Sequence, residues 1–222
     1  MIRTAMTLAL VASFGGARLV RAQETLVPGD REASAQLAQI VETTRENGLP
    51  VDPIVAKVQY AVRVAHAEPS RIVASARAIA SRLAVARDAL APASPTDIIA
   101  GADALGAGAN KDALRAVRGA SGGKPMATPL GVLAQLLETQ VPVDRATEIV
   151  TNLMRRGATA DQLVALGNNV NDDVRGVSDG GKRGAAALAA LDARARFLSG
   201  VLAPAGRAMS ATLSSPQAPK KP

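Results

Sequence analysis

Apolar residues recur every three or four positions along most of the chain, which is the spacing of the buried side of an α-helix. The longest uninterrupted run covers residues 71–90. Helix starts recur at intervals of roughly 15 to 25 residues, and no parallel-sheet pattern is present. The pattern predicts an all-α protein of about eight or nine mostly short helices, in an antiparallel, irregular α-solenoid-like or orthogonal array.

The same spacing predicts which side of each helix is buried. In the long run at 71–90, the shared face consists of Ile72, Ala76, Ile79, Leu83 and Leu90. In the run that begins at Thr128, it consists of Leu130, Leu133, Ala134 and Leu137.

A short frame recurs before the expected helices, as GLPVDPI from Gly48, GANKDAL from Gly108, QVPVDRA from Gln140 and GATADQL from Gly157. A carboxylate in a first helical turn accepts free backbone N–H groups and lies at the positive end of the helix dipole. We therefore interpret the frame as helix punctuation. The residues assigned to helix starts, including those of two candidate capping boxes, are Asp52, Asp97, Asn110, Asp112, Asp144, Thr159 and Asp161.

The alternative interpretation of the frame is functional. Asp52, Asp112, Asp144 and Asp161 would then line a common surface and bind a cation or a cationic peptide. Because Asp is common at helix starts and needs no ligand there, punctuation is the preferred interpretation.

The amino-acid composition limits which kinds of binding site and metal site the chain can form. Hydrophobic residues make up 48% of the chain and aromatic residues 1%, so we expect a core of Ala, Val, Leu and Ile. Few rings are present on which a sugar or an unpaired base could stack. Cysteine is absent and His66 is the single histidine, which excludes thiolate and multi-histidine metal sites. The sequence assigns no catalytic residue, no cofactor and no metal ligand.

Two glycine-rich segments partly match known catalytic or nucleotide-binding motifs, but each lacks a feature that its motif requires. Residues 176–182 fit the phosphate-binding pattern G-x-x-x-x-G-K, but Arg183 stands where Ser or Thr should hold Mg²⁺. Ser121 and Lys124 have S-x-x-K spacing, but Gly122 and Gly123 disfavour the helix that would present them together. We interpret both segments as linkers between helices.

The first 22 residues have the features of an export signal. A basic lead, an apolar run from Ala5 to Phe14 and small residues before Gln23 predict cleavage after Ala22, with Ala17 as the alternative site. An uncleaved anchor is the competing interpretation. The predicted organisation is a signal at 1–22, an Ala-rich helical domain at 23–203 with a sub-boundary possible near 119–127, and a disordered Pro, Ala and Lys tail at 204–222.

Charge argues against nucleic acid as a partner. The formal net charge is +7, but it falls to +4 without Arg3, Arg18 and Arg21 of the signal. The remaining basic residues are scattered among acids rather than gathered. No segment after the signal has the length of a membrane span.

The sequence thus predicts an exported protein, periplasmic or extracellular, that is not an enzyme and that binds an unknown protein or peptide partner or serves a structural role in a bacterial-type cell envelope. One alternative is a membrane-surface protein with an uncleaved N-terminal anchor. The other is a hydrolase with Asp or Glu chemistry that the sequence does not locate.

Overall fold

The computed structural model of the protein describes residue 27, residues 30–178 and residues 180–202. Within these ranges it has nine helices and no strand, so the all-α prediction is confirmed. The predicted signal at 1–22 and the predicted tail at 204–222 lie outside the described residues. The chain divides into two compact units, Met1–Arg87 and Asp88–Pro222, and each is described by itself.

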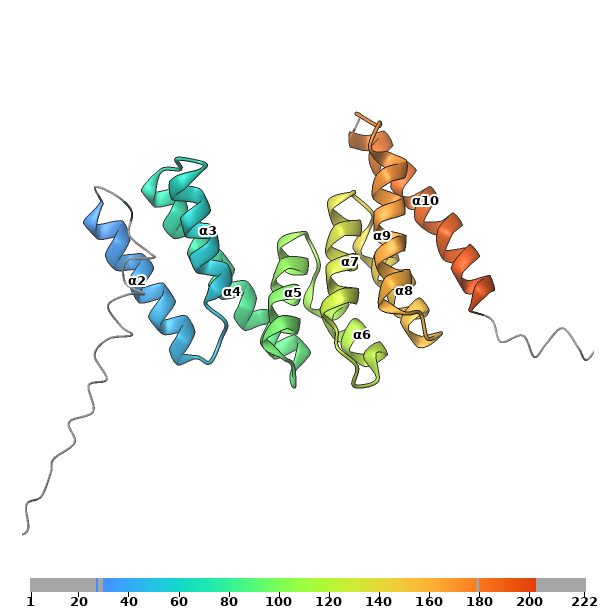
Figure 1. Ribbon diagram of the computed structural model, residues 1–222, viewed down its shortest axis with the longest axis horizontal. Coiled ribbons are helices and arrows are strands. Elements are labelled where there is room, and N and C mark those ends of the chain that lie inside the picture. The colour runs from blue at the N-terminus through green and yellow to red at the C-terminus, as the bar shows by residue number, and fades with distance from the viewer. Residues whose placement is uncertain (1–26, 28–29, 179, 203–222) are drawn as a thin grey trace, which may run out of the picture. The chain divides into compact units, whose positions relative to one another are not determined.

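The first unit contains α2 (Arg31–Glu46), α3 (Asp52–Arg63) and most of α4 (Pro69–Leu90) (Figure 1). Helix α2 begins where the Asp30 side chain accepts a hydrogen bond from the Ala33 N–H at 2.8 Å. It ends before Gly48, whose φ of 68° suits a residue without a Cβ. The largest fully buried side chains of this unit are those of Leu37, Ile54, Val58 and Leu83.

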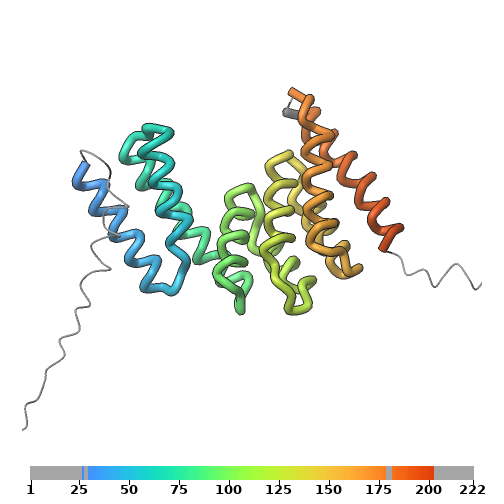
Figure 2. Tube along the Cα trace, in the orientation of Figure 1, coloured from blue at the N-terminus to red at the C-terminus, as the bar shows by residue number. Residues whose placement is uncertain are grey.

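The second unit holds the remaining helices in two layers (Figure 2). Helix α5 packs against α7 and α7 against α9, while α6 packs against α8 and α10 packs mainly against α9. We call α5, α7 and α9 the first layer and α6, α8 and α10 the second layer. Their bounds are α5 (Pro95–Gly106), α6 (Lys111–Ser121), α7 (Ala127–Glu138), α8 (Val143–Arg155), α9 (Ala160–Val174) and α10 (Gly180–Val201).

Both layers contribute leucines to one aliphatic core. The two aromatic residues within the described ranges, Tyr60 and Phe197, are exposed. The predicted core of Ala, Val, Leu and Ile is therefore confirmed for the part of the chain that the structure describes. The leucines of the second unit that are less than 2% exposed are Leu90, Leu114, Leu130, Leu133, Leu136, Leu153, Leu166 and Leu191.

Helix α7 is buried on more sides than its sequence predicts. Leu136 is fully buried, whereas Leu137, which the helical stripe selects, is only half-buried. The reason is that α7 contacts α5, α8 and α9, so a single stripe does not describe its buried surface.

Helix α10 begins earlier than expected, at Gly180 rather than after the glycine-rich segment. A Cβ added at Gly184 would lie 3.1 Å from the Gln140 carbonyl oxygen, so glycine allows this first part of α10 to lie close to the turn between α7 and α8. Residues 119–127, where a sub-boundary was considered, lie inside the second unit; the division between the units falls within α4, after Arg87.

Candidate functional site

The residues assigned to helix starts lie in first turns or caps. Asn110 accepts a hydrogen bond from the Ala113 N–H at 2.8 Å. The hydroxyl of Thr159 accepts one from the Gln162 N–H at 3.2 Å, and the Gln162 side chain accepts one from the Thr159 N–H at 2.9 Å. Four further residues lie in first turns as acids rather than as caps. They are Asp52, Asp112, Asp144 and Asp161.

Within the second unit, the structure does not place Asp112, Asp144 and Asp161 in one layer. Asp112 and Asp144 lie on α6 and α8 of the second layer, whereas Asp161 lies on α9 of the first. Asp112 forms an ion pair at 3.0 Å with Arg115 of its own helix. Among the described residues no group of three or more His, Cys, Asp or Glu could hold a metal ion.

Asp97 has a role beyond its capping box. Its carboxylate, only 6% exposed, accepts the Ser94 hydroxyl at 2.8 Å and the backbone N–H of Met126 at 2.7 Å. One buried side chain thereby fixes the start of α5 against the residue that precedes α7. Sequence reasoning missed this bond because its two partners are 29 residues apart.

The two glycine-rich segments have structural roles. Ser121 donates its hydroxyl hydrogen to the Arg118 carbonyl oxygen at 2.8 Å, and Gly122, with φ of 57°, ends α6 in the left-handed conformation. In the other segment, residues 180–183 form the first turn of α10. The linker interpretation of that turn is therefore corrected.

The first layer turns a polar, acidic surface outward. Exposed and half-buried positions recur every three or four residues on each of its helices, and the Gln135 amide of α7 donates a hydrogen bond to Asn168 of α9 at 3.2 Å across that surface. We call this surface the acidic face. Its residues are Thr96, Ala100 and Asp103 on α5, Thr128, Gly131, Gln135 and Glu138 on α7, and Asp161, Val164, Asn168 and Asp172 on α9.

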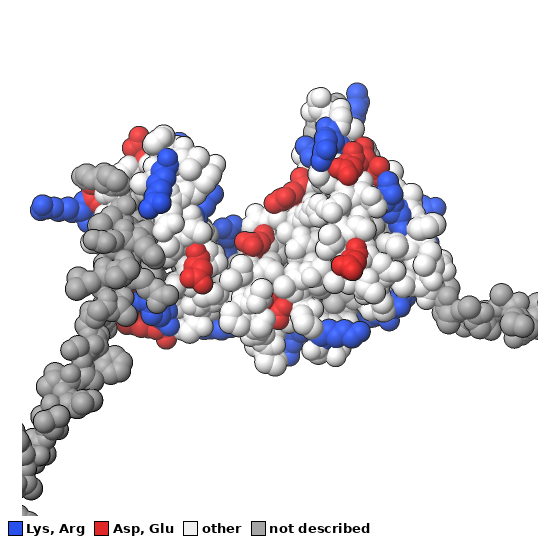
Figure 3. Space-filling model, in the orientation of Figure 1, with Lys and Arg blue, Asp and Glu red and all other residues white. Residues whose placement is uncertain are grey.

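The two layers differ sharply in charge. Helices α5, α7 and α9 contain no Lys or Arg, and their acids are Asp97, Asp103, Glu138, Asp161, Asp172 and Asp173. Figure 3 shows acidic side chains over the part of the second unit where these helices are drawn, with basic ones along its lower edge and also at its upper end. The second layer is predominantly basic, with Lys111, Arg115, Arg118, Arg145, Arg155, Lys182, Arg183, Arg194 and Arg196 against Asp112, Asp144, Glu148 and Asp192.

Ion pairs shift three pKa values, all in the second unit. Hydrogen bonds from the Arg145 guanidinium to Glu148 and to Asp192 raise the pKa of Arg145. Two 3.0 Å hydrogen bonds from Arg194 of α10 to Asp173 of α9 lower the pKa of that carboxyl and raise the pKa of Arg194. The Arg145–Asp192 pair joins α8 to α10, and the Asp173–Arg194 pair joins α9 to α10, both at the surface.

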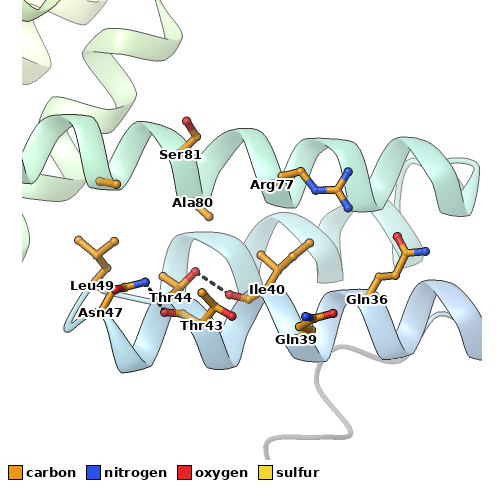
Figure 4. A pocket seen from close by; sticks show the side chains of 11 residues that line it. Gln36, Gln39, Ile40, Thr43, Thr44, Asn47, Leu49, Arg77, Ala80 and Ser81 are labelled. Carbon is orange, nitrogen blue, oxygen red and sulfur yellow. Dashed lines mark hydrogen bonds between the residues drawn. The ribbon is translucent and has the colours of Figure 1, made fainter.

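The first unit has a polar groove of about 420 Å³ between α2 and α4 (Figure 4). Gln36, Thr43 and Asn47 of α2 and Arg77 of α4 are among its polar lining residues, and no carboxylate is among the lining residues. Asn47 donates its amide hydrogen to the Thr43 carbonyl oxygen at 2.8 Å. This lining offers hydrogen bonds to a polar ligand but no paired acid and base for proton transfer.

Comparisons with protein-family models, with curated proteins and with solved structures give no match for this chain. Among the described helices, none combines the length and the apolar character that crossing a membrane requires. The candidate site is therefore the acidic face, identified from its own chemistry. The signal for it was present in the sequence, as the lack of Lys and Arg at 95–106, 127–138 and 160–174, but it becomes meaningful only once these helices are known to be neighbours.

Proposed function

We propose that this protein is an interaction module that binds a cationic segment of a partner protein on its acidic face. The observation that carries the proposal is the position of the acids. Each of the three helices places an acid in its last turn, as Asp103, Glu138 and Asp172, and none has a basic residue there. In the second layer, α6 and α8 follow the opposite rule, with Arg118 and Arg155 in their last turns.

An acid at a helix C-terminus is unfavourable. The last turn is the negative end of the helix dipole, where a carboxylate costs about 0.3–1 kcal/mol at an exposed position. The first-layer helices α5, α7 and α9 each place such an acid on the same surface, and Arg175, which directly follows α9, offsets part of the cost at Asp172 through an ion pair at 3.0 Å. Local features that lower stability are expected at functional sites. A cationic ligand would be attracted both by the carboxylates and by the helix ends.

The remaining residues of the acidic face suit a peptide ligand. Gln135 and Asn168 carry amides that donate and accept hydrogen bonds, which a peptide backbone needs. Ala100 and Gly131 are small, so a chain can lie close to the helices. Since the carboxylates are exposed, we expect attraction that is strong at low salt and screened over about 8 Å at physiological ionic strength.

The test is a binding titration with matched charge variants. The probe is a fluorescent peptide as long as α7 in which Lys and Ser alternate, and the titration follows its anisotropy in low salt. Asp103→Asn, Glu138→Gln and Asp172→Asn combined should weaken binding about fivefold to tenfold, because each exposed charge contributes a few tenths of a kcal/mol. The control combines Asp112→Asn, Asp144→Asn and Glu148→Gln, which removes equal charge from the second layer.

The outcomes distinguish binding at the acidic face from attraction to the net charge of the whole protein. The proposal requires the first-layer variant to lose much more affinity than the second-layer variant. Equal losses would mean that the peptide responds only to the total charge of the protein, and the acidic face would then have no special role. A peptide alternating Glu and Ser should not bind either form.

We further propose that the protein works outside the cytoplasm, as a module of the cell envelope. The support is the order of basic lead, apolar run and small residues in residues 1–22. Mass spectrometry of the protein purified from its native host tests this proposal. A chain that begins at Gln23 or Arg18 supports it, whereas an intact Met1 favours the membrane-surface alternative.

A further inference from the structure

The last described helix of the second unit, α10, exposes two large apolar side chains. Of the described side chains of α10, which spans 22 residues, only those of Ala187 and Leu191 are buried. Phe197 is 72% exposed and Val201 is 59% exposed. The terminal helix of a helical stack normally has a polar outer side that keeps the stack soluble. This side of α10 is instead suited to contact with another apolar surface.

A groove runs between α9 and α10 beside these residues and has a volume of about 450 Å³. We call it the end groove. The Asp173–Arg194 ion pair joins its two sides. Its apolar lining consists of Ala165 and Leu166 from α9, and Ala190, Ala193, Phe197 and Leu198 from α10.

The position of the end groove in the stack indicates what fills it. Helix α7 lies beside α5, and α9 lies beside α7, so each helix of the first layer is covered on one side by the next. The contact between α7 and α9 is close, because a Cβ added at Gly167 would lie 3.1 Å from the Cδ atom of Gln135. The end groove is the surface of α9 on the side away from α7, where a further first-layer helix would continue the same interface.

We propose that the end groove binds an amphipathic α-helix of a partner protein, with small and apolar residues along its contacting side. The small side chains of Ala165 and Ala193 allow a helix to approach closely, and Phe197 provides a large apolar anchor. This site goes beyond the acidic face and does not depend on it.

The chain itself offers a reporter for the test. It contains no tryptophan, so Phe197→Trp places a single indole fluorophore at the groove. The probe is a synthetic helix as long as α9 with Leu and Ala along one side and Gln and Lys along the other, and a scrambled peptide of equal composition is its control. We expect the ordered helix to shift the tryptophan emission of this variant to the blue at concentrations at which the scrambled peptide has no effect.

A second set of variants measures the contribution of Phe197 itself. With labelled probe helix, Phe197→Ser should weaken binding about tenfold or more, the loss expected for an aromatic anchor. Tyr60→Ser, which removes the other exposed aromatic side chain of the described residues, should leave the affinity unchanged, and so should the triple variant of the acidic face. Equal binding of ordered and scrambled peptides, or no response to Phe197→Ser, would overturn the proposal.

Two further outcomes would assign the groove to other occupants and so would also overturn it. If a chain that ends at Leu202 binds the probe much more tightly than the full chain, residues 203–222 compete for the groove. If sedimentation shows dimers that Phe197→Ser abolishes, a second copy occupies it. Loss of probe binding in the acidic-face variant alone would instead show that the peptide is held by charge.

Discussion

The two layers of the second unit are alike inside and different outside. Leu133 of α7 and Leu153 of α8 are both almost completely buried in the shared core. The helices of the first layer contain acids but no Lys or Arg. The helices of the second layer contain both basic and acidic residues, with the basic ones in excess. Because burial leaves the outward residues free to vary, a regular difference there is not explained by packing. The comparison shows where the structure alone does not account for the sequence.

The largest expected effect tests the likeness of the two cores. Leu133→Ala in the first layer and Leu153→Ala in the second should each lower the free energy of unfolding by about 2–5 kcal/mol, because both leave a cavity among aliphatic side chains. Urea unfolding followed by circular dichroism measures both losses. A loss below about 1 kcal/mol in either variant would mean that this layer is loosely packed and that the likeness is wrong.

A smaller effect separates buried from exposed acids. Asp97→Asn should lower the free energy of unfolding by about 1–3 kcal/mol, because the buried N–H of Met126 loses a charged acceptor. Asp112→Asn, at an exposed first-turn position, is the matched control and should change stability by less than about 0.5 kcal/mol. If the two variants are equally stable, the bond between Asp97 and Met126 does not anchor α7.

Reciprocal charge changes at helix ends should act in opposite directions. Glu138→Lys at the end of α7 should raise the free energy of unfolding by about 0.3–1 kcal/mol, and Arg155→Glu at the end of α8 should lower it by a similar amount, since both act on the negative end of a dipole. Thermal unfolding at low ionic strength resolves such differences. If Glu138→Lys is destabilising, the acids of the first layer are structural, and the argument for the acidic face loses its basis.

The smallest effect concerns the Asp173–Arg194 pair. The carboxyl of Asp173 should titrate below 3.8, the ordinary pKa of this group, because Arg194 stabilises its charged form. A lowered folded-state pKa means that the stabilisation is present above the ordinary pKa and disappears as the pH falls through the lowered value. NMR titration of the carboxyl carbon measures the shift. Arg194→Gln should return the pKa of Asp173 toward 3.8, whereas an unchanged pKa would rule out the pair in solution.

Helical periodicity predicted most of the fold because it reports burial on one side of a helix. All five residues assigned to the buried face at 71–90 are buried in α4. The method failed for α7, where Leu136 replaces Leu137, because this helix has neighbours on several sides. It also misplaced the start of α10, since the close approach of Gly184 to Gln140, which favours glycine, is a contact that local propensity does not contain.

The candidate site was less predictable than the fold. The four aspartates considered as a common surface occupy first turns on different helices. The acids that do share a surface, Asp103, Glu138 and Asp172, lie instead near helix ends and become neighbours only through the order in which α5, α7 and α9 pack. Contacts between helices that are distant in sequence are not encoded in any local pattern.

The most direct test of the acidic face is an NMR map of where a cationic peptide binds. Backbone amide shifts of the isotope-labelled protein would be followed while the peptide of alternating Lys and Ser is added. The account predicts saturable shifts at exposed residues of α5, α7 and α9, including Asp103, Gln135 and Asn168, and small changes in α6 and α8. Shifts of equal size in both layers, or shifts concentrated in the second layer, would contradict it.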